Sequence, residues 1–118
     1  DIAQPDICVG GGLTEFQRIH ALAAAYGVNV IPHVWGSGIA LATALHAISA
    51  LPLSPHTANP VPFQNEPMVE YDRNFNPLRD ELLKEPIVIE EGKVKVPKGF
   101  GLGVDINEDV LTKYRTDI

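Results

Sequence analysis

Two residues whose types could carry proton-transfer chemistry, Asp6 and His33, each directly follow a proline at the end of a short apolar run. Histidine is the side chain that gains and loses a proton near neutral pH. A carboxylate that accepts a hydrogen bond from Nδ1–H fixes the tautomer and leaves Nε2 free to take a proton. The pair therefore predicts a general base, His33, that Asp6 orients.

The elements around this pair must bring the two side chains together. The apolar runs at residues 2–7 and 28–35 predict short strands, and residues 14–26 between them predict a helix. Three features support this helix. Thr14 and Gln17 form a capping box at its start, and Gly27 can terminate it. Its apolar face is formed by Phe16, Ile19, Ala23 and Tyr26. A strand, a helix and a strand in this order form the unit of a parallel sheet, whose consecutive strands are usually neighbours about 4.8 Å apart. We therefore expect Asp6 and His33 within hydrogen-bonding distance at one edge of the sheet.

Spacing alone leaves other interpretations open. His33 could be a satisfied core histidine, with Asp6 capping the turn that follows it. The chain could also be a non-catalytic α/β module that binds a partner through its second helix. The distance between Asp6 and His33 distinguishes the module from the catalytic pair, because a separation well beyond about 3.2 Å would exclude a direct hydrogen bond.

The second helix is expected at residues 39–51, with Ser37 as its N-cap and Pro52 ending it. It carries no formal charge and is apolar nearly all round, so it requires burial on more than one side. The rest of the chain predicts a sequence of shorter elements. They are a Pro-rich surface loop at 53–67, a strand at 68–72, a helix at 77–84 capped by Asn76, a hairpin at 87–96 turning at Glu91-Gly92, and a helix at 108–114.

Three further residues are candidates for the same site. Glu70 and Asp72 share one face of the strand expected at 68–72, and either could be an acid near His33 or part of a solvated pair. Trp35 shares strand parity with His33, so it could form a wall of the pocket or pack in the core.

The length and composition of the chain exclude several classes of function. The chain has 118 residues, enough for one small domain, and its net charge of −6 without a Lys/Arg cluster argues against nucleic acid or an anionic membrane as partner. No apolar run approaches the roughly 20 residues of a membrane span. The single cysteine, Cys8, excludes an internal disulfide framework and fits a reducing, cytoplasmic compartment. Because the chain opens on a strand-like run without an initiator Met, we expect it to be cut from something longer.

Several motifs in combination resemble a known family. They are QPDICVGGGLTEF, VNVIPHVWGSGIALATALH, PMVEYDRN, NPLRDELL and GFGLGVDINEDVLTKYR. At these residues the chain resembles the C-terminal part of the mandelate racemase/muconate lactonising enzyme group of the enolase superfamily, and is most similar to the mandelate racemase subgroup. The resemblance covers essentially the whole chain.

The resemblance implies an α/β fold, the C-terminal portion of a modified TIM barrel. Residues 1–85 would supply barrel strands six to eight with their helices, and residues 86–118 a C-terminal segment that packs back toward the capping domain. It implies that His33 is a catalytic base on strand seven and Asp6 its partner on strand six. Glu70 would hydrogen-bond the enediolate from strand eight, with Asp72 as the reserve candidate for that position. We also expect Asp72 and Trp35 to bind substrate.

The resemblance also implies a magnesium-dependent enzyme that removes the proton α to a carboxylate. The Mg²⁺ ligands would lie on strands three to five, so none is expected in this sequence. We expect an acid-sugar dehydratase, with a racemase or epimerase of a 2-hydroxy or amino acid, or a non-catalytic fragment, as alternatives. The expected partners are a small carboxylate substrate, the remainder of the barrel and the capping domain, and further copies in a homo-oligomer. The chain alone is expected to be inactive.

Overall fold

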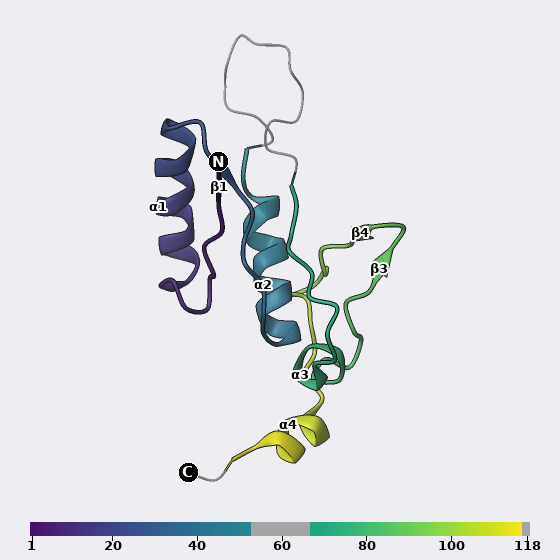
Figure 1. Ribbon diagram of the computed structural model, residues 1–118. Coiled ribbons are helices and arrows are strands. Elements are labelled where there is room, and N and C mark those ends of the chain that lie inside the picture. The colour runs from purple at the N-terminus through teal and green to yellow at the C-terminus, as the bar shows by residue number, and fades with distance from the viewer. Residues whose placement is uncertain (53–66, 117–118) are drawn as a thin grey trace.

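The computed structural model describes residues 1–52 and 67–116 and has an α/β architecture (Figure 1). Its N-terminal half contains β1 (Ile2–Ala3), α1 (Gly12–Ala25), β2 (Asn29–Val30) and α2 (Gly38–Ser49). Helices α1 and α2 lie side by side in Figure 1 and contact each other. Most of the Pro-rich stretch expected to form a loop lies outside the described residues.

The two N-terminal strands pair in parallel, as expected for the strand–helix–strand unit. Ile2 lies opposite Asn29 and Ala3 opposite Val30, and the ladder continues as a single bridge between Asp6 and His33. The regular strands are shorter than the runs at 2–7 and 28–35, because Pro5 and Pro32 have no N–H to donate to a ladder.

Helix α1 begins two residues earlier than expected and without a capping box. Its N-cap is Gly11 in the left-handed region, and no side chain caps the helix, so Thr14 lies inside the first turn. The N–H of Gly12 donates instead to Ile7 O at 2.9 Å. Gly27, at φ 67°, is the expected left-handed residue after the helix, but Tyr26 is exposed at the C-cap and does not extend the apolar face.

Helix α2 forms the centre of the core. Ser37 is its N-cap as predicted, and the Ser37 Oγ accepts a hydrogen bond from Ala40 N at 3.3 Å. The helix ends at Ser49 rather than at residue 51. Most of its residues are buried, and it contacts both α1 and α3 (Pro77–Asp80). The buried residues are Gly38, Leu41, Ala42, Ala44, Leu45, Ala47 and Ile48. The expected burial on more than one side is therefore confirmed.

The strand expected at residues 68–72 is wrong as a hydrogen-bonded element. Within the described residues, 67–73 pair with no other strand. The helix that follows is capped by Asn76, as predicted, but α3 ends at Asp80 instead of residue 84. Residues 82–84 leave the helix because their backbone groups pair with the C-terminal segment, where Leu83 forms a bridge with Ile106.

The C-terminal part matches the expected elements. Strands β3 (Ile89–Glu90) and β4 (Lys93–Val94) form an antiparallel hairpin, and both residues of its turn, Glu91 and Gly92, have positive φ. Helix α4 (Glu108–Tyr114) follows the N-cap Asn107. Among the described residues, no helix is both long enough and apolar enough to cross a lipid bilayer.

The close contact between α2 and α3 predicts the effect of adding one methyl group. A Cβ at Gly38 would lie 2.8 Å from Leu83 side-chain atoms and 3.0 Å from the backbone oxygen of Arg79. We expect Gly38→Ala to lower the free energy of unfolding by about 1–3 kcal/mol, because overpacking displaces α3. Urea denaturation measures this change. The control Ser49→Ala, at the exposed end of the same helix, should stay within about 0.5 kcal/mol of wild type, and an equal loss in both variants would contradict the packing argument.

Candidate active site

The turn after β1 holds the Asp6 carboxylate in one orientation. Its Oδ1 accepts hydrogen bonds from the backbone N–H groups of Cys8 at 2.7 Å and Val9 at 3.1 Å. The backbone oxygen of Asp6 accepts another from Gly10 N at 2.7 Å. A Cβ at Gly10 would lie 2.7 Å from that oxygen, so only glycine fits this close approach.

The second carboxylate oxygen of Asp6 faces His33. The Asp6 Oδ2 lies 3.0 Å from His33 Nδ1, and the two backbones meet in the parallel bridge, with His33 N donating to Pro5 O at 3.2 Å. An ionised carboxylate only accepts hydrogen bonds, so Nδ1 donates and Nε2 remains free to take a proton. The predicted proximity of this pair is therefore confirmed.

The exposure of the pair decides between two interpretations. The side chain of His33 is 44% exposed and that of Asp6 is 21% exposed. In the described part of the chain, His33 is therefore not a core histidine, and its ring can be reached from solvent. Asp6 does cap the turn that follows it, as the alternative proposed, but with Oδ1, and its Oδ2 bonds His33.

Opposing effects act on the pKa of Asp6. Burial raises the pKa of this carboxyl, but the hydrogen bonds from His33, Cys8 and Val9 and the charge of His33 together lower it further, so its pKa lies below the ordinary value. Asp6 is therefore ionised near neutral pH, which is the state that orients the imidazole.

Glu70 and Trp35 lie near this edge in different environments. Glu70 is exposed and lines a small pocket that also includes Val34, the residue after His33, and Gly36. It makes no hydrogen bond or ion pair with another described residue. Trp35 is 70% exposed, so core packing of its ring within the described residues is wrong. The catalytic and substrate-binding roles of these residues stay predictions.

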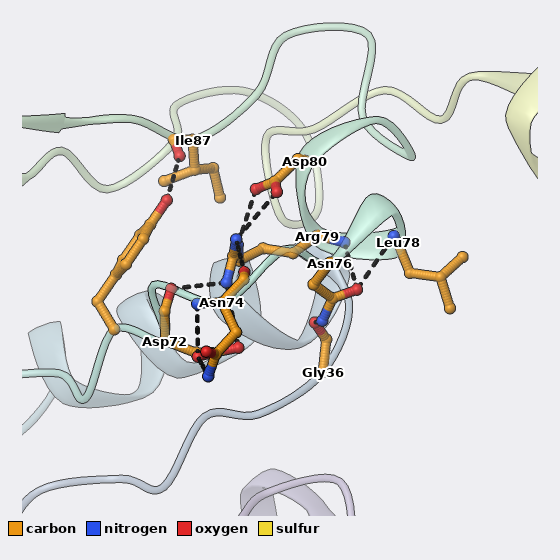
Figure 2. A network of polar contacts seen from close by, with 9 residues as sticks. Gly36, Asp72, Asn74, Asn76, Leu78, Arg79, Asp80 and Ile87 are labelled. Carbon is orange, nitrogen blue, oxygen red and sulfur yellow. Dashed lines mark hydrogen bonds and ion pairs between the residues drawn. The ribbon is translucent and has the colours of Figure 1, made fainter.

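Asp72 is already bound by its own chain. Its Oδ1 accepts hydrogen bonds from the backbone N–H and the side-chain amide of Asn74, and its Oδ2 lies 3.3 Å from Arg79 Nη1 (Figure 2). The backbone hydrogen bond from Asn74 is the largest of several effects that lower the pKa of Asp72. This carboxylate therefore holds its loop together, and its expected role with substrate stays a prediction.

Sequence reasoning missed Arg79 as a residue of this region. The guanidinium joins Asp72, Asn74 and Asp80, and the neighbouring Asn76 caps α3 and donates from Nδ2 to Gly36 O at 2.9 Å. The signal was present in the NPLRDELL motif, where an arginine is followed directly by an aspartate. Nothing in its spacing indicated the carbonyl oxygens that Arg79 would bind.

No metal site is formed by the part of the chain that the structure describes. It contains no group of three or more His, Cys, Asp or Glu side chains placed to hold a metal ion. His46 Nε2 hydrogen-bonds Leu102 O at 3.0 Å and so joins α2 to the C-terminal segment. Burial and the nearby Asp6 charge raise the pKa of Cys8, which keeps this residue in its unreactive thiol form.

The lowered pKa of Asp6 predicts a pH dependence of stability. A carboxyl with a depressed folded-state pKa stabilises the fold above its unfolded pKa of about 3.9, and this contribution disappears as pH falls through the folded pKa. We expect Asp6→Asn to flatten the fall of the unfolding free energy between about pH 5 and pH 2, measured by urea denaturation. His33→Ala should flatten it in part, because it removes one of the bonds that lower this pKa. An unchanged slope in Asp6→Asn would contradict the assignment.

Residues 1–110 match the family model described as enolase C-terminal domain-like. The D-galactarolactone cycloisomerase of Agrobacterium fabrum is 45% identical over 115 residues, which cover 98% of this chain and 29% of that protein. The arabinonate dehydratase of Saccharolobus solfataricus is 35% identical over 115 residues, covering 98% of this chain and 27% of that protein. The chain thus spans less than a third of the length of these relatives.

Solved structures agree with the sequence matches. The crystal structure of the 3,6-anhydro-D-galactonate cycloisomerase from Zobellia galactanivorans superposes with a TM-score of 0.77 at 43% identity, over 96% of this chain and 28% of that one. Further structural neighbours include mandelate racemase/muconate lactonizing enzymes, in line with the resemblance in the motifs. The chain belongs to the enolase superfamily, whose C-terminal domain it matches over nearly its whole length.

Proposed function

We propose that this chain supplies the histidine–aspartate pair of an enzyme that removes the proton α to the carboxylate of an acid sugar. The observation that carries the proposal is the 3.0 Å contact between Asp6 Oδ2 and His33 Nδ1. The strands place this pair at one edge of the sheet, with 44% of the His33 side chain exposed to solvent. The dehydratases and cycloisomerases among the relatives, with names such as arabinonate dehydratase, support this class of substrate.

In the proposed reaction, His33 Nε2 takes the α-proton while Asp6 holds the ring and stabilises the imidazolium that forms. Loss of this proton builds a second negative charge on the substrate, as an enediolate. A hydrogen-bond donor aimed at that charge lowers the barrier. Glu70, which lines the pocket next to Val34, would form this hydrogen bond.

In the dehydratase form of the proposal, the imidazolium of His33 then returns the proton to the β-hydroxyl. The C–O bond breaks, water leaves and the resulting enol becomes a 2-keto-3-deoxy acid. His33 ends the cycle neutral, so the same residue serves as base and as acid. This is the function that we place first.

A cycloisomerase is the second candidate, and the 45% identity to the D-galactarolactone cycloisomerase favours it. If the leaving group is a ring oxygen instead of a hydroxyl, the same proton abstraction opens the ring and no atom is lost. Racemisation or epimerisation would invert the α-carbon only. Mass spectrometry of the product separates the dehydratase, whose product has lost water, from the isomerases, and ring opening separates the two isomerases.

The rest of the expected assembly belongs to the proposal. Members of the enolase superfamily are generally magnesium-dependent, and Mg²⁺ would bind the substrate carboxylate. The described residues form no site for the ion, so its ligands would come from the remainder of a TIM barrel. The division at residue 85, the capping domain as a partner, a homo-oligomer and a cytoplasmic location are part of the same proposal.

Replacing the base should stop the first chemical step. In a complete enzyme that carries this chain as its C-terminal part, we expect His33→Asn to lower kcat by about 10²- to 10⁴-fold. It should also abolish exchange of the substrate α-proton with deuterium from solvent, measured by NMR on acid sugars such as galactonate and arabinonate.

The matched control is His20→Asn, which changes a histidine of α1 and should leave turnover close to wild type. Circular dichroism should show the same fold for both variants. Full α-proton exchange in His33→Asn would refute the assignment of His33 as the base.

The isolated chain should be inactive, because it supplies the proton-transfer pair without a metal site in its described residues. The measurement is turnover of the same acid sugars by the purified 118-residue chain with added Mg²⁺. Measurable turnover would contradict the view that the remaining barrel strands are required.

A further inference from the structure

We propose that Arg79 is a positioning residue that holds residues 68–74, and with them Glu70, against the turn that follows His33. The inference rests on the proposed function in that it takes Glu70 to act on the charge that develops on the substrate. It assigns no contact between Arg79 and the substrate. The evidence for this positioning role is the set of hydrogen bonds that the Arg79 guanidinium makes.

The Arg79 guanidinium is shared between main-chain and side-chain oxygens (Figure 2). Nη1 donates to Asp72 O at 2.6 Å, and Nη2 donates to Asn74 O at 2.7 Å. Nε and Nη2 also bond the two carboxylate oxygens of Asp80, at 2.8 and 2.9 Å. Because two of the acceptors are backbone carbonyls, Arg79 sets the path of the chain at residues 72–74 as well as the orientation of side chains.

The contacts of this side chain satisfy its charge in a nearly closed environment. Only 11% of the Arg79 side chain is exposed, and its guanidinium lies 5.5 Å from the centre of the Tyr71 ring. The hydrogen bond with Asp80 raises the pKa of Arg79 despite burial. A planar fork with five donors can reach all these acceptors at once, whereas the point charge of a lysine cannot.

Arg79 lines the same small pocket as Glu70 and the residues that follow His33. Glu70 precedes Tyr71 in the chain, and the small pocket that it lines is also lined by Arg79 and Asp72 and by Val34 and Gly36. Asn76, at the start of the same helix, donates to Gly36 O at 2.9 Å. Helix α3 is thus bonded through Arg79 to the backbone at Asp72 and Asn74, and through its N-cap Asn76 to the turn after His33.

No strand pairing performs this task within the described residues, because 67–73 join no ladder there. The hydroxyl of Tyr71 donates to Ile87 O at 3.1 Å, which fixes the outer side of the segment. The contacts of Arg79 fix the backbone at Asp72 and Asn74. Loss of the guanidinium would therefore release the backbone that presents Glu70 while leaving the Asp6–His33 pair in place.

The test uses a complete enzyme that carries this chain and compares Arg79→Met and Arg79→Lys with the control Arg18→Met. Arg18 is an exposed arginine of α1 that pairs with Glu15. We expect both Arg79 variants to lower kcat by on the order of 10- to 100-fold, with a smaller change in KM, because a misplaced donor weakens the transition state most. Arg18→Met should have neither effect. A wild-type kcat in Arg79→Lys would overturn the inference that the planar guanidinium, with its five donors, is required to hold this segment.

A double-mutant cycle separates positioning from general stability. If Arg79 acts through Glu70, Arg79→Met should lower kcat little further in a Glu70→Gln enzyme, whereas independent effects would multiply and overturn the inference. Hydrogen exchange should accelerate at residues 68–76 in Arg79→Met and stay unchanged at residues 28–35. Unchanged exchange at 68–76 would also overturn it.

The outcome of this test is distinguishable from failure of the proposed function. Wild-type kcat in Glu70→Gln would overturn the positioning inference, but it would leave the role of His33 in place. That role is tested separately by α-proton exchange with solvent. Loss of this exchange in His33→Asn together with wild-type kcat in the Arg79 variants would refute only the inference on Arg79.

Discussion

The site depends on the parallel pairing of two short strands, each followed two residues later by a proline. A proline cannot donate a ladder hydrogen bond, so the regular pairing of β1 with β2 stops and resumes only as the bridge between Asp6 and His33. The backbone oxygen of Pro5 still accepts from His33 N. Register thus places the carboxylate opposite the imidazole, and a shift by one residue would point one of them to the other face.

Burial of α2 gives this pairing its support. The helix presents apolar residues on several sides, and it is packed by α1 and by α3. The turn between His33 and this helix is held at Gly36 by Asn76 and at Ser37 by the helix cap. The packing of α2 and of the turn before it therefore fixes the backbone next to His33, while the ring of this residue remains exposed to solvent.

Local chemistry predicted most of the elements, and long-range contacts decided the rest. The caps Ser37 and Asn76 and the hairpin turn at Glu91-Gly92 depend on neighbours in sequence, and all three are confirmed. The capping box at Thr14 was wrong because the glycines before it let the helix start earlier. The strand at 68–72 and the length of α3 depended on partners far along the chain, which periodicity does not contain.

The same division applies to the site. The spacing of Asp6 and His33 is a local property of one strand–helix–strand unit, so their 3.0 Å contact could be predicted from sequence. The role of Arg79 could not be predicted in this way, because its partners include two backbone carbonyls. Every residue has a backbone carbonyl, so the residue types do not indicate which one is bound. Side chains that bind backbone carbonyls outside a helix cap therefore escape prediction from sequence, whereas caps such as Ser37 and Asn76 do not. In this chain Arg79 lines the same small pocket as Glu70 and Gly36, where small displacements would alter the geometry of the site.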